Sequence, residues 1–236
     1  MSSFCSLASF YSTSILPSLA LFNKKQEIID SLANGIDVNQ QGPQGMTALY
    51  YACWNNRVDI IHLLLQHPDI NVNLCKRGGQ SPLAVACECG KYNSVAVLIQ
   101  DARVDINLPD ENGYTPLMWA CYDGKVQVVK LLLAFDRSVD VTKKTTKRVR
   151  EWVLIAPEST VLEIAMKMNH TQIVSLLQEY MTSQEETKSK LKQELHLLGW
   201  GFFFSFLFFS FLFFLSFFPF SISFTICFVL LGTTIL

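Results

Sequence analysis

The chain has 236 residues, with 19 lysines and arginines against 20 aspartates and glutamates, and a formal net charge of −1. This length suffices for one domain with its own hydrophobic core, and the balanced charge gives no reason to expect nucleic acid as a partner. No Asp, Glu, Lys or Arg follows Glu194, and 14 of the 18 phenylalanines lie beyond residue 200. The composition therefore predicts a water-soluble module followed by an apolar tail.

The N-terminal segment, residues 1–23, carries no charged side chain and is rich in Ser, Phe and Leu. We interpret it as a disordered start that merges into a degenerate first helix of the repeats described below. A secretory signal is the alternative interpretation. The segment lacks a basic start, however, and Pro17 and several serines interrupt its apolar run, which is atypical of signals.

Three phrases of the same residue pattern then occur at a fixed interval, at residues 45–53, 79–87 and 113–121. Their helix-capping hydroxyl residues are 34 positions apart, at Thr47, Ser81 and Thr115. A period in this range indicates a stacked solenoid. A second set of equivalent positions has the same period and is occupied by Asn39, Asn73 and Asn107.

The residue types of these phrases predict helix starts. A Thr or Ser side chain can cap a helix through its oxygen, and Pro82 and Pro116 follow at the first helical position, where a missing N–H is harmless. A leucine and an alanine three residues later share one helix face in each phrase. The small alanine allows a neighbouring helix to approach closely.

An amphipathic segment follows each phrase, and its apolar positions are again 34 apart, as in Ile61, Val95 and Val129. Together these features resemble the ankyrin repeat. The T-P-L-x-x-A core is matched closely, although the usual histidine after the leucine is replaced by Tyr50, Ala84 and Met118. The resemblance covers about residues 24–180. It implies an all-α ankyrin-repeat solenoid of about four to five helix-turn-helix repeats with projecting β-turn fingers, and a role in binding proteins.

The period breaks once, because the next helix start, Thr160, follows Thr115 by 45 residues instead of 34. The additional residues lie after Asp140, and we expect them to form an enlarged β-hairpin finger. This finger is a candidate contact for an acidic protein, a nuclear import receptor or an anionic membrane. Its basic residues are Lys143, Lys144, Lys147, Arg148 and Arg150. The alternative is a solvated loop without a partner.

A charged spacer, residues 181–196, follows the repeats, and an uncharged tail of 40 residues occupies positions 197–236. The tail exceeds the roughly 20 residues that cross a bilayer as a helix. The nearby lysines lie only on its N-terminal side, so that side should face the cytosol. We therefore expect a C-terminal transmembrane-type helix that anchors the repeats at a membrane, facing the cytosol.

The tail also permits another interpretation. Residues 202–221 contain only Phe, Ser, Leu and Pro, whose codons can all be written in pyrimidines, so the tail could be an artefact of the gene model. The chain would then be a soluble, cytoplasmic binding module. A third hypothesis makes the repeats a regulatory fragment of a larger enzyme or channel.

No catalytic signature is present, since the sequence lacks a phosphate-binding loop and the common hydrolase motifs. We therefore expect no enzyme, no cofactor and no small-molecule substrate. Cysteines at one repeated helical slot, Cys53, Cys87 and Cys121, are better explained as small buried side chains in a reducing compartment than as disulfides. Cys87 and Cys89 are too close in sequence for the usual zinc pair, so no metal site is expected.

A protein-binding surface is the remaining candidate. In each first helix, the second and fifth residues after the leucine should turn away from the second helix, which pairs Tyr51 with Trp54 and Trp119 with Tyr122. Tyr and Trp commonly anchor binding hot spots. The resemblance adds the concave groove and the finger tips as the usual contact surfaces. The predicted binding residues, besides the basic finger, are Tyr51, Trp54, Asn55, Lys76, Arg77, Glu88, Asp110, Asn112, Trp119, Tyr122 and Asp123. The alternative is that these aromatic rings pack against adjacent fingers.

Overall fold

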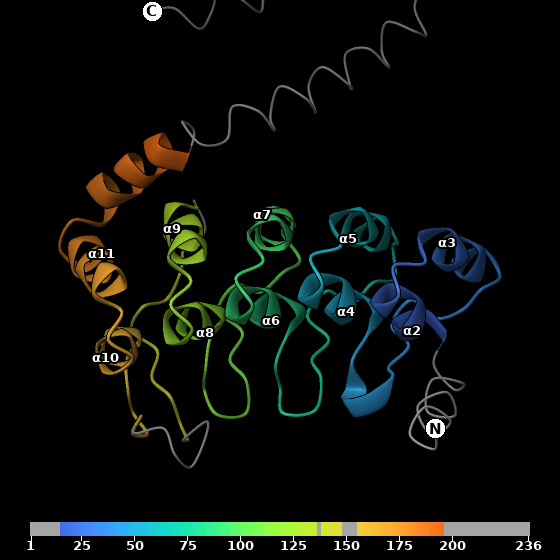
Figure 1. Cartoon of the computed structure of the whole chain (residues 1–236), viewed down its shortest axis with the longest axis horizontal. Helices are drawn as coiled ribbons and strands as arrows, with labels where there is room; N and C mark the ends of the chain where they lie inside the picture. The colour runs from blue at the N-terminus through green and yellow to red at the C-terminus, as the bar shows by residue number, and fades with distance from the viewer. Residues whose placement is uncertain (1–14, 136–137, 148–154, 196–236) are drawn as a thin grey trace, which may run out of the picture. The chain divides into compact units, whose positions relative to one another are not determined.

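The computed structural model describes residues 15–135, 138–147 and 155–195. Within them the chain forms five helix pairs, and it contains no strand, only two isolated β-bridges. The first helices of the pairs form one row, and the second helices form a parallel row beside it (Figure 1). The inner row is α2 (Ile15–Leu21), α4 (Ala48–Trp54), α6 (Pro82–Glu88), α8 (Pro116–Tyr122) and α10 (Val161–Lys167). The outer row is α3 (Lys25–Ala33), α5 (Val58–Leu65), α7 (Tyr92–Gln100), α9 (Val126–Ala134) and α11 (Thr171–Thr182).

Hydroxyl caps start four of the five inner helices. The side-chain oxygens of Thr47, Ser81 and Thr115 accept hydrogen bonds from backbone N–H groups three residues later, and Pro82 and Pro116 lie in the first turn. Thr160 and Glu163 form a reciprocal capping box at α10. Each cap satisfies an N–H that the helix would otherwise leave without a partner. The predicted helix starts are confirmed.

The turn from inner to outer helix repeats one backbone conformation. In all five pairs, the residue two positions before the outer helix has a positive φ of 56° to 67°, and it is always Asn or Gly. These are the residue types that adopt the left-handed region at the lowest cost. The five positions are Asn23, Asn56, Gly90, Gly124 and Asn169.

The core lies between the two rows. The repeated apolar positions of the outer helices are buried, including Ile61, Val95 and Val129. Cys53, Cys87 and Cys121 are fully buried free thiols, which confirms their prediction as small core side chains. Burial raises the pKa of each of these thiols, because a thiolate would lose its hydration there.

The second repeated phrase forms a ladder that joins successive repeats. Asn39 Nδ2 donates to the Asp69 carbonyl at 2.8 Å, and Asn39 Oδ1 accepts from the Asn71 N–H at 2.7 Å. Asn73 repeats both bonds one repeat later, with the Arg103 carbonyl and the Asp105 N–H. Asn107 repeats them again with Ser138 and Asp140. Each amide therefore closes the connection to the next repeat.

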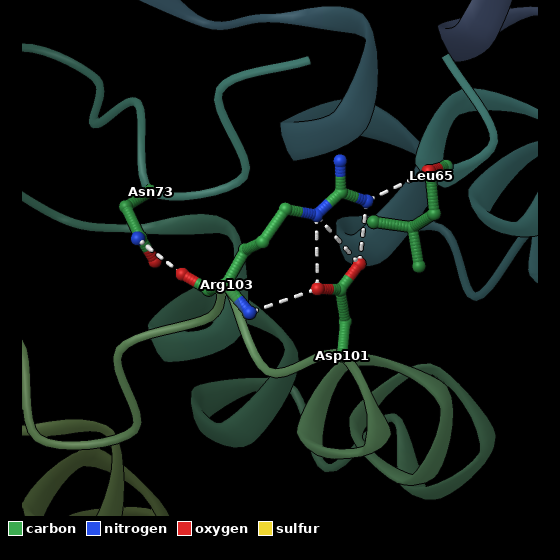
Figure 2. Close-up of polar contacts among 4 residues, drawn as sticks. All are labelled: Leu65, Asn73, Asp101 and Arg103. Carbon is green, nitrogen blue, oxygen red and sulfur yellow. Dashed lines mark hydrogen bonds and ion pairs between the residues drawn. The ribbon is translucent and has the colours of Figure 1, made fainter. Parts of the chain in front are cut away.

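An arginine reinforces one joint of this ladder (Figure 2). Arg103, which accepts the Asn73 bond through its carbonyl, reaches back with its guanidinium to the Leu65 carbonyl at 2.7 Å. The same guanidinium forms a 2.6 Å ion pair with Asp101. Leu65 is the last residue of α5, so the arginine satisfies a carbonyl at a helix C-terminus, where positive charge is favourable.

At the base of the long finger, the two chain segments pair in an antiparallel manner, as in a β-hairpin. Lys144 and Thr160 form an antiparallel β-bridge, and the Thr145 N–H donates to the Ser159 carbonyl at 3.0 Å. The Thr145 side chain is fully buried and accepts the Ser159 N–H. Residues 148–154 lie outside the described part of the chain.

Two of the predicted domain limits can be located on the described helices. The limit at residue 24 lies between α2 and α3, and residues 184–195 of the charged spacer are helical. That helix buries Thr187 and Leu191, and Lys190 pairs with Glu179 of α11 at 2.8 Å. Among the described residues, no helix is long and apolar enough to cross a bilayer. The candidate tail, residues 197–236, lies outside them.

Candidate functional site

The end of α4 presents the first aromatic pair. Tyr51 and Trp54 stack with ring centroids 6.1 Å apart and planes inclined by 25°. Tyr51 is buried, whereas Trp54 is 41% exposed. Asn55 donates its side-chain amide to the Tyr51 carbonyl at 3.0 Å and thereby closes the helix. Trp54 is therefore a large apolar ring held at the surface by a buried one.

The end of α8 differs from this arrangement. The ring centroids of Trp119 and Tyr122 are 5.8 Å apart, but the two residues are only 6% and 5% exposed. Both also contact the buried ring of Tyr114, a residue of the preceding finger. These aromatic side chains pack against a finger, as the alternative interpretation held. Trp119 and Tyr122 consequently offer a partner little surface.

Asp110 belongs to the same buried cluster. Its Oδ1 accepts the N–H groups of Asn112 and Tyr114, and its Oδ2 accepts the Trp119 indole N–H at 3.1 Å. Burial raises the pKa of this carboxyl, and the hydrogen bonds oppose that shift. Asp110 therefore orders the finger that precedes α8, and its carboxylate is already engaged.

A hydrogen-bonded chain joins α4 to α6. The Tyr50 hydroxyl donates to Gln80 Oε1 at 2.8 Å, and Gln80 Nε2 donates to Glu88 Oε2 at 2.6 Å. The Lys76 ammonium lies over the Tyr50 ring, 5.5 Å from its centroid. Burial and the nearby Glu88 carboxylate raise the pKa of the Tyr50 phenol. The hydrogen bond from Gln80 therefore holds the Glu88 carboxylate in place, while the residue stays partly exposed.

Cys89 follows Glu88 in the sequence, and several charged side chains act on its thiol. Burial raises the pKa of its thiol, and the carboxylates of Glu88 and Asp123 raise it further, against the opposing effect of Lys91 and Lys125. Asp123 is exposed. The exposed residues Trp54 and Asp123, the half-buried residues Glu88 and Cys89, and the buried supporting ring of Tyr51 constitute what we call the inner-helix face.

The finger tips are linked to one another through their backbones. The Arg77 N–H donates to the Gln44 carbonyl at 2.7 Å, and the Thr146 N–H donates to the Asn112 carbonyl at 2.8 Å. The Arg77 side chain is exposed, and that of Asn112 is half-buried. Backbone hydrogen bonds between adjacent fingers therefore position the predicted tip residues, and their side chains remain at least partly accessible.

The described part of the basic finger carries three lysines in different situations. Lys143 donates to the Asn107 carbonyl at 2.8 Å. Lys144 lies 4.0 Å from Glu158 on an exposed surface, and Lys147 is exposed. The predicted contacts Arg148 and Arg150 lie outside the described residues.

No metal-binding cluster of three His, Cys, Asp or Glu side chains occurs in the part of the chain that the structure describes. A hollow of about 330 Å³ lies between α10 and α11, lined by Met166, Asn169, Thr171, Val174, Ser175 and Gln178. None of these six lining side chains carries a charge.

Sequence reasoning missed Tyr50, Gln80 and the position of Lys76. The first two are buried and hydrogen-bonded across 30 residues, and Lys76 approaches the Tyr50 ring from the following finger. No local spacing in the sequence marks such contacts. The repeat register does place Gln80 directly before the N-cap residue Ser81, and therefore close to the N-terminus of α6.

The stacked helix pairs, the fingers and the asparagine ladder together define a helical repeat protein. The comparison with protein families identifies which kind: the model for ankyrin repeats, in three copies, matches residues 18–110 and 98–188. The chain belongs to the ankyrin-repeat family, and the resemblance seen in the sequence is confirmed. The comparison with curated proteins found no match.

Proposed function

We propose that the chain is a non-catalytic adaptor that binds another protein through the inner-helix face and the neighbouring finger tips. Ankyrin repeats form protein-interaction modules, which supports the general class. The observation that carries the specific proposal is the Trp54 ring, which is 41% exposed at the end of an inner helix although its stacking partner is buried.

The energetics favour Trp54 as the anchor. Exposed aromatic rings on rigid elements can bury a large apolar area with little loss of conformational entropy. Tyr51 restricts the ring by stacking, so part of the ordering cost is met before binding. Arg77 and Lys147, at exposed positions on two fingers, would contribute the polar rim of such an interface.

The test compares proteins cross-linked to the wild-type chain in cells with those cross-linked to Trp54→Ala. Met181→Ala is the matched control, because Met181 is 54% exposed but lies at the end of α11. We expect a set of proteins that wild type and Met181→Ala share and Trp54→Ala loses, at an unchanged urea midpoint. An identical set for all three folded proteins would contradict the proposal.

We also propose, from the uncharged tail alone, that the repeats are held at the cytosolic side of a membrane. Forty residues without a charge are long enough to span the hydrocarbon core. The measurement is mass spectrometry of the native protein after separation of membranes from the soluble fraction. Peptides from residues 197–236 in the membrane fraction would support an anchored adaptor. A soluble product lacking them would support a cytoplasmic binding module without a tail.

A further inference from the structure

We propose that the inner-helix face receives an arginine or lysine side chain of its partner, between the Trp54 ring and the Glu88 carboxylate. This inference rests on the proposed function and specifies the chemistry of the segment that binds. It is carried by an exposed aromatic ring and a positioned carboxylate at equivalent positions of two neighbouring inner helices.

Trp54 and Glu88 occupy equivalent positions in successive repeats. They are 34 residues apart, and each is the last residue of its inner helix. The helices α4 and α6 stand side by side in the inner row (Figure 1), and packed helix axes are about 8–10 Å apart. One extended side chain can therefore contact both residues.

The Trp54 ring provides a surface for a cation. One side of the indole stacks on Tyr51, and 41% of the residue stays exposed. Tryptophan is the strongest aromatic partner of ammonium and guanidinium groups. The structure already contains this kind of contact nearby, because the Lys76 ammonium lies 5.5 Å from the centroid of the Tyr50 ring. That internal lysine takes the Tyr50 ring and leaves Trp54 to an incoming group.

The Glu88 carboxylate provides the counter-charge. Gln80 holds Oε2 at 2.6 Å, and the Tyr50 hydroxyl in turn holds Gln80. Within the residues that the structure describes, Glu88 forms no ion pair with a lysine or arginine of the chain. A carboxylate fixed through one oxygen is pre-organised to accept a charge-assisted hydrogen bond through the other.

The alternatives for the partner's chemistry are less favourable. An apolar side chain over this site would remove water from Glu88 without replacing its hydrogen bonds, which is costly. An acidic side chain would be repelled by Glu88 and by Asp123, which both act on the neighbouring Cys89. Lys91 and Lys125 temper this field near Cys89. Arginine suits the site best, because its planar guanidinium can stack on an indole while it donates to a carboxylate.

The experiment selects binding peptides from a random displayed library on the immobilised full-length chain in mild detergent, with a parallel selection on Trp54→Ala. Enriched peptides are synthesised with each arginine, and separately with its uncharged isostere citrulline. Affinities are then measured by calorimetry for wild type, Trp54→Ala, Trp54→Phe, Glu88→Gln and the control Glu186→Gln. Glu186 is an exposed carboxylate of the helix at residues 184–195.

We expect the enriched peptides to share an arginine or lysine and to lose about tenfold in affinity when citrulline replaces arginine, or roughly 1.4 kcal/mol. Glu88→Gln should weaken the arginine peptide and reduce its advantage over citrulline, since both changes delete the ion pair with Glu88 while the contact of arginine with Trp54 remains. Glu186→Gln should change neither value. Trp54→Phe should bind between wild type and Trp54→Ala, and higher salt should weaken the arginine peptide most.

Other results would overturn the inference in distinguishable ways. Peptides that need Trp54 but carry no basic residue, or that bind equally with citrulline, would refute the basic partner and leave the proposed function intact. Failure to enrich any peptide on wild type over Trp54→Ala would refute the binding face itself. The citrulline comparison changes only the peptide, so it remains decisive even if a variant of the chain folds poorly.

Discussion

Equivalent residues of successive repeats serve different purposes in this chain. The slot that holds Trp54 in α4 holds Glu88 in α6 and Tyr122 in α8. The first two are accessible, whereas Tyr122 is 5% exposed because the Tyr114 ring of the preceding finger contacts it. The repeat dictates where a side chain begins, and its neighbours decide whether a partner can reach it.

Asp140 gives a prediction about pH at this scale. Its carboxylate accepts the Thr142 hydroxyl at 2.7 Å and the Thr142 N–H at 2.9 Å. These hydrogen bonds lower the pKa of Asp140 in the folded protein. Its contribution to stability is therefore present above the usual carboxyl pKa and is lost as the pH falls through the lowered value.

We expect Asp140→Asn to reduce the free energy of unfolding at pH 7 by less than about 1 kcal/mol, since Asp140 is only half-buried and solvent screens its charge. Urea titrations at pH 7 and pH 3 measure the difference from wild type, which should shrink at the lower pH. Glu186→Gln is the control for a general loss of negative charge. A difference that stays constant or grows towards pH 3 would contradict the assigned role.

At the scale of one element, the asparagine ladder is the regular connection between repeats. Asn73 donates to the Arg103 carbonyl and accepts the Asp105 N–H, both at 2.8 Å. Asn73→Ala removes both bonds and should cost about 1–2 kcal/mol. Chemical denaturation measures this cost, with Asn93→Ala, at an exposed position of α7, as the matched control. Equal stability of the two variants would show that the ladder contributes nothing.

The turns between inner and outer helices yield a second prediction for elements. Gly90 and Gly124 both have positive φ, at 67° and 66°. A Cβ at Gly90 would meet the flexible Lys125 stem at 2.8 Å, whereas one at Gly124 would meet the His170 ring at 2.6 Å. That ring is held by a 3.1 Å contact between Nε2 and the Tyr122 carbonyl.

Both alanine variants incur the backbone cost of the left-handed region, roughly 1–2 kcal/mol. We expect Gly124→Ala to be the less stable, because the His170 ring must also give up its contact, while the Lys125 chain can move aside. Thermal unfolding of the two variants side by side tests the order. If Gly90→Ala proved as destabilising as Gly124→Ala, the histidine contact would not be the cause.

At the scale of the whole molecule, each repeat of a solenoid is stabilised by its neighbours. Among the described helices, α4, α6 and α8 each have an inner helix on both sides, whereas α2 and α10 have one (Figure 1). We therefore expect amide hydrogens of α6 to exchange most slowly and those of α2 and α3 to be among the fastest of the repeats. Hydrogen exchange followed by mass spectrometry measures this gradient. Uniform exchange across the five pairs would instead indicate a single cooperative unit.

The sequence by itself determined the periodic part of the fold. A Thr or Ser cap, a proline in the first turn and an apolar stripe act locally or between adjacent repeats, so Thr47, Ser81, Thr115 and the buried cysteines could be assigned from spacing. The ankyrin family was evident for the same reason. The long finger could be located from the break in the period, because an insertion displaces every later position equally.

Only the tertiary structure decided which surface residues remain available. The Trp119 indole is hydrogen-bonded to Asp110, nine residues earlier in the sequence, and the Tyr50 hydroxyl is hydrogen-bonded to Gln80, 30 residues later. Such contacts depend on how a finger folds over its helix, which no local pattern encodes. Trp54 and Tyr122 occupy the same position of the repeat, yet the structure exposes the first and buries the second. Side-chain packing between neighbouring repeats, rather than position within the repeat, made that difference.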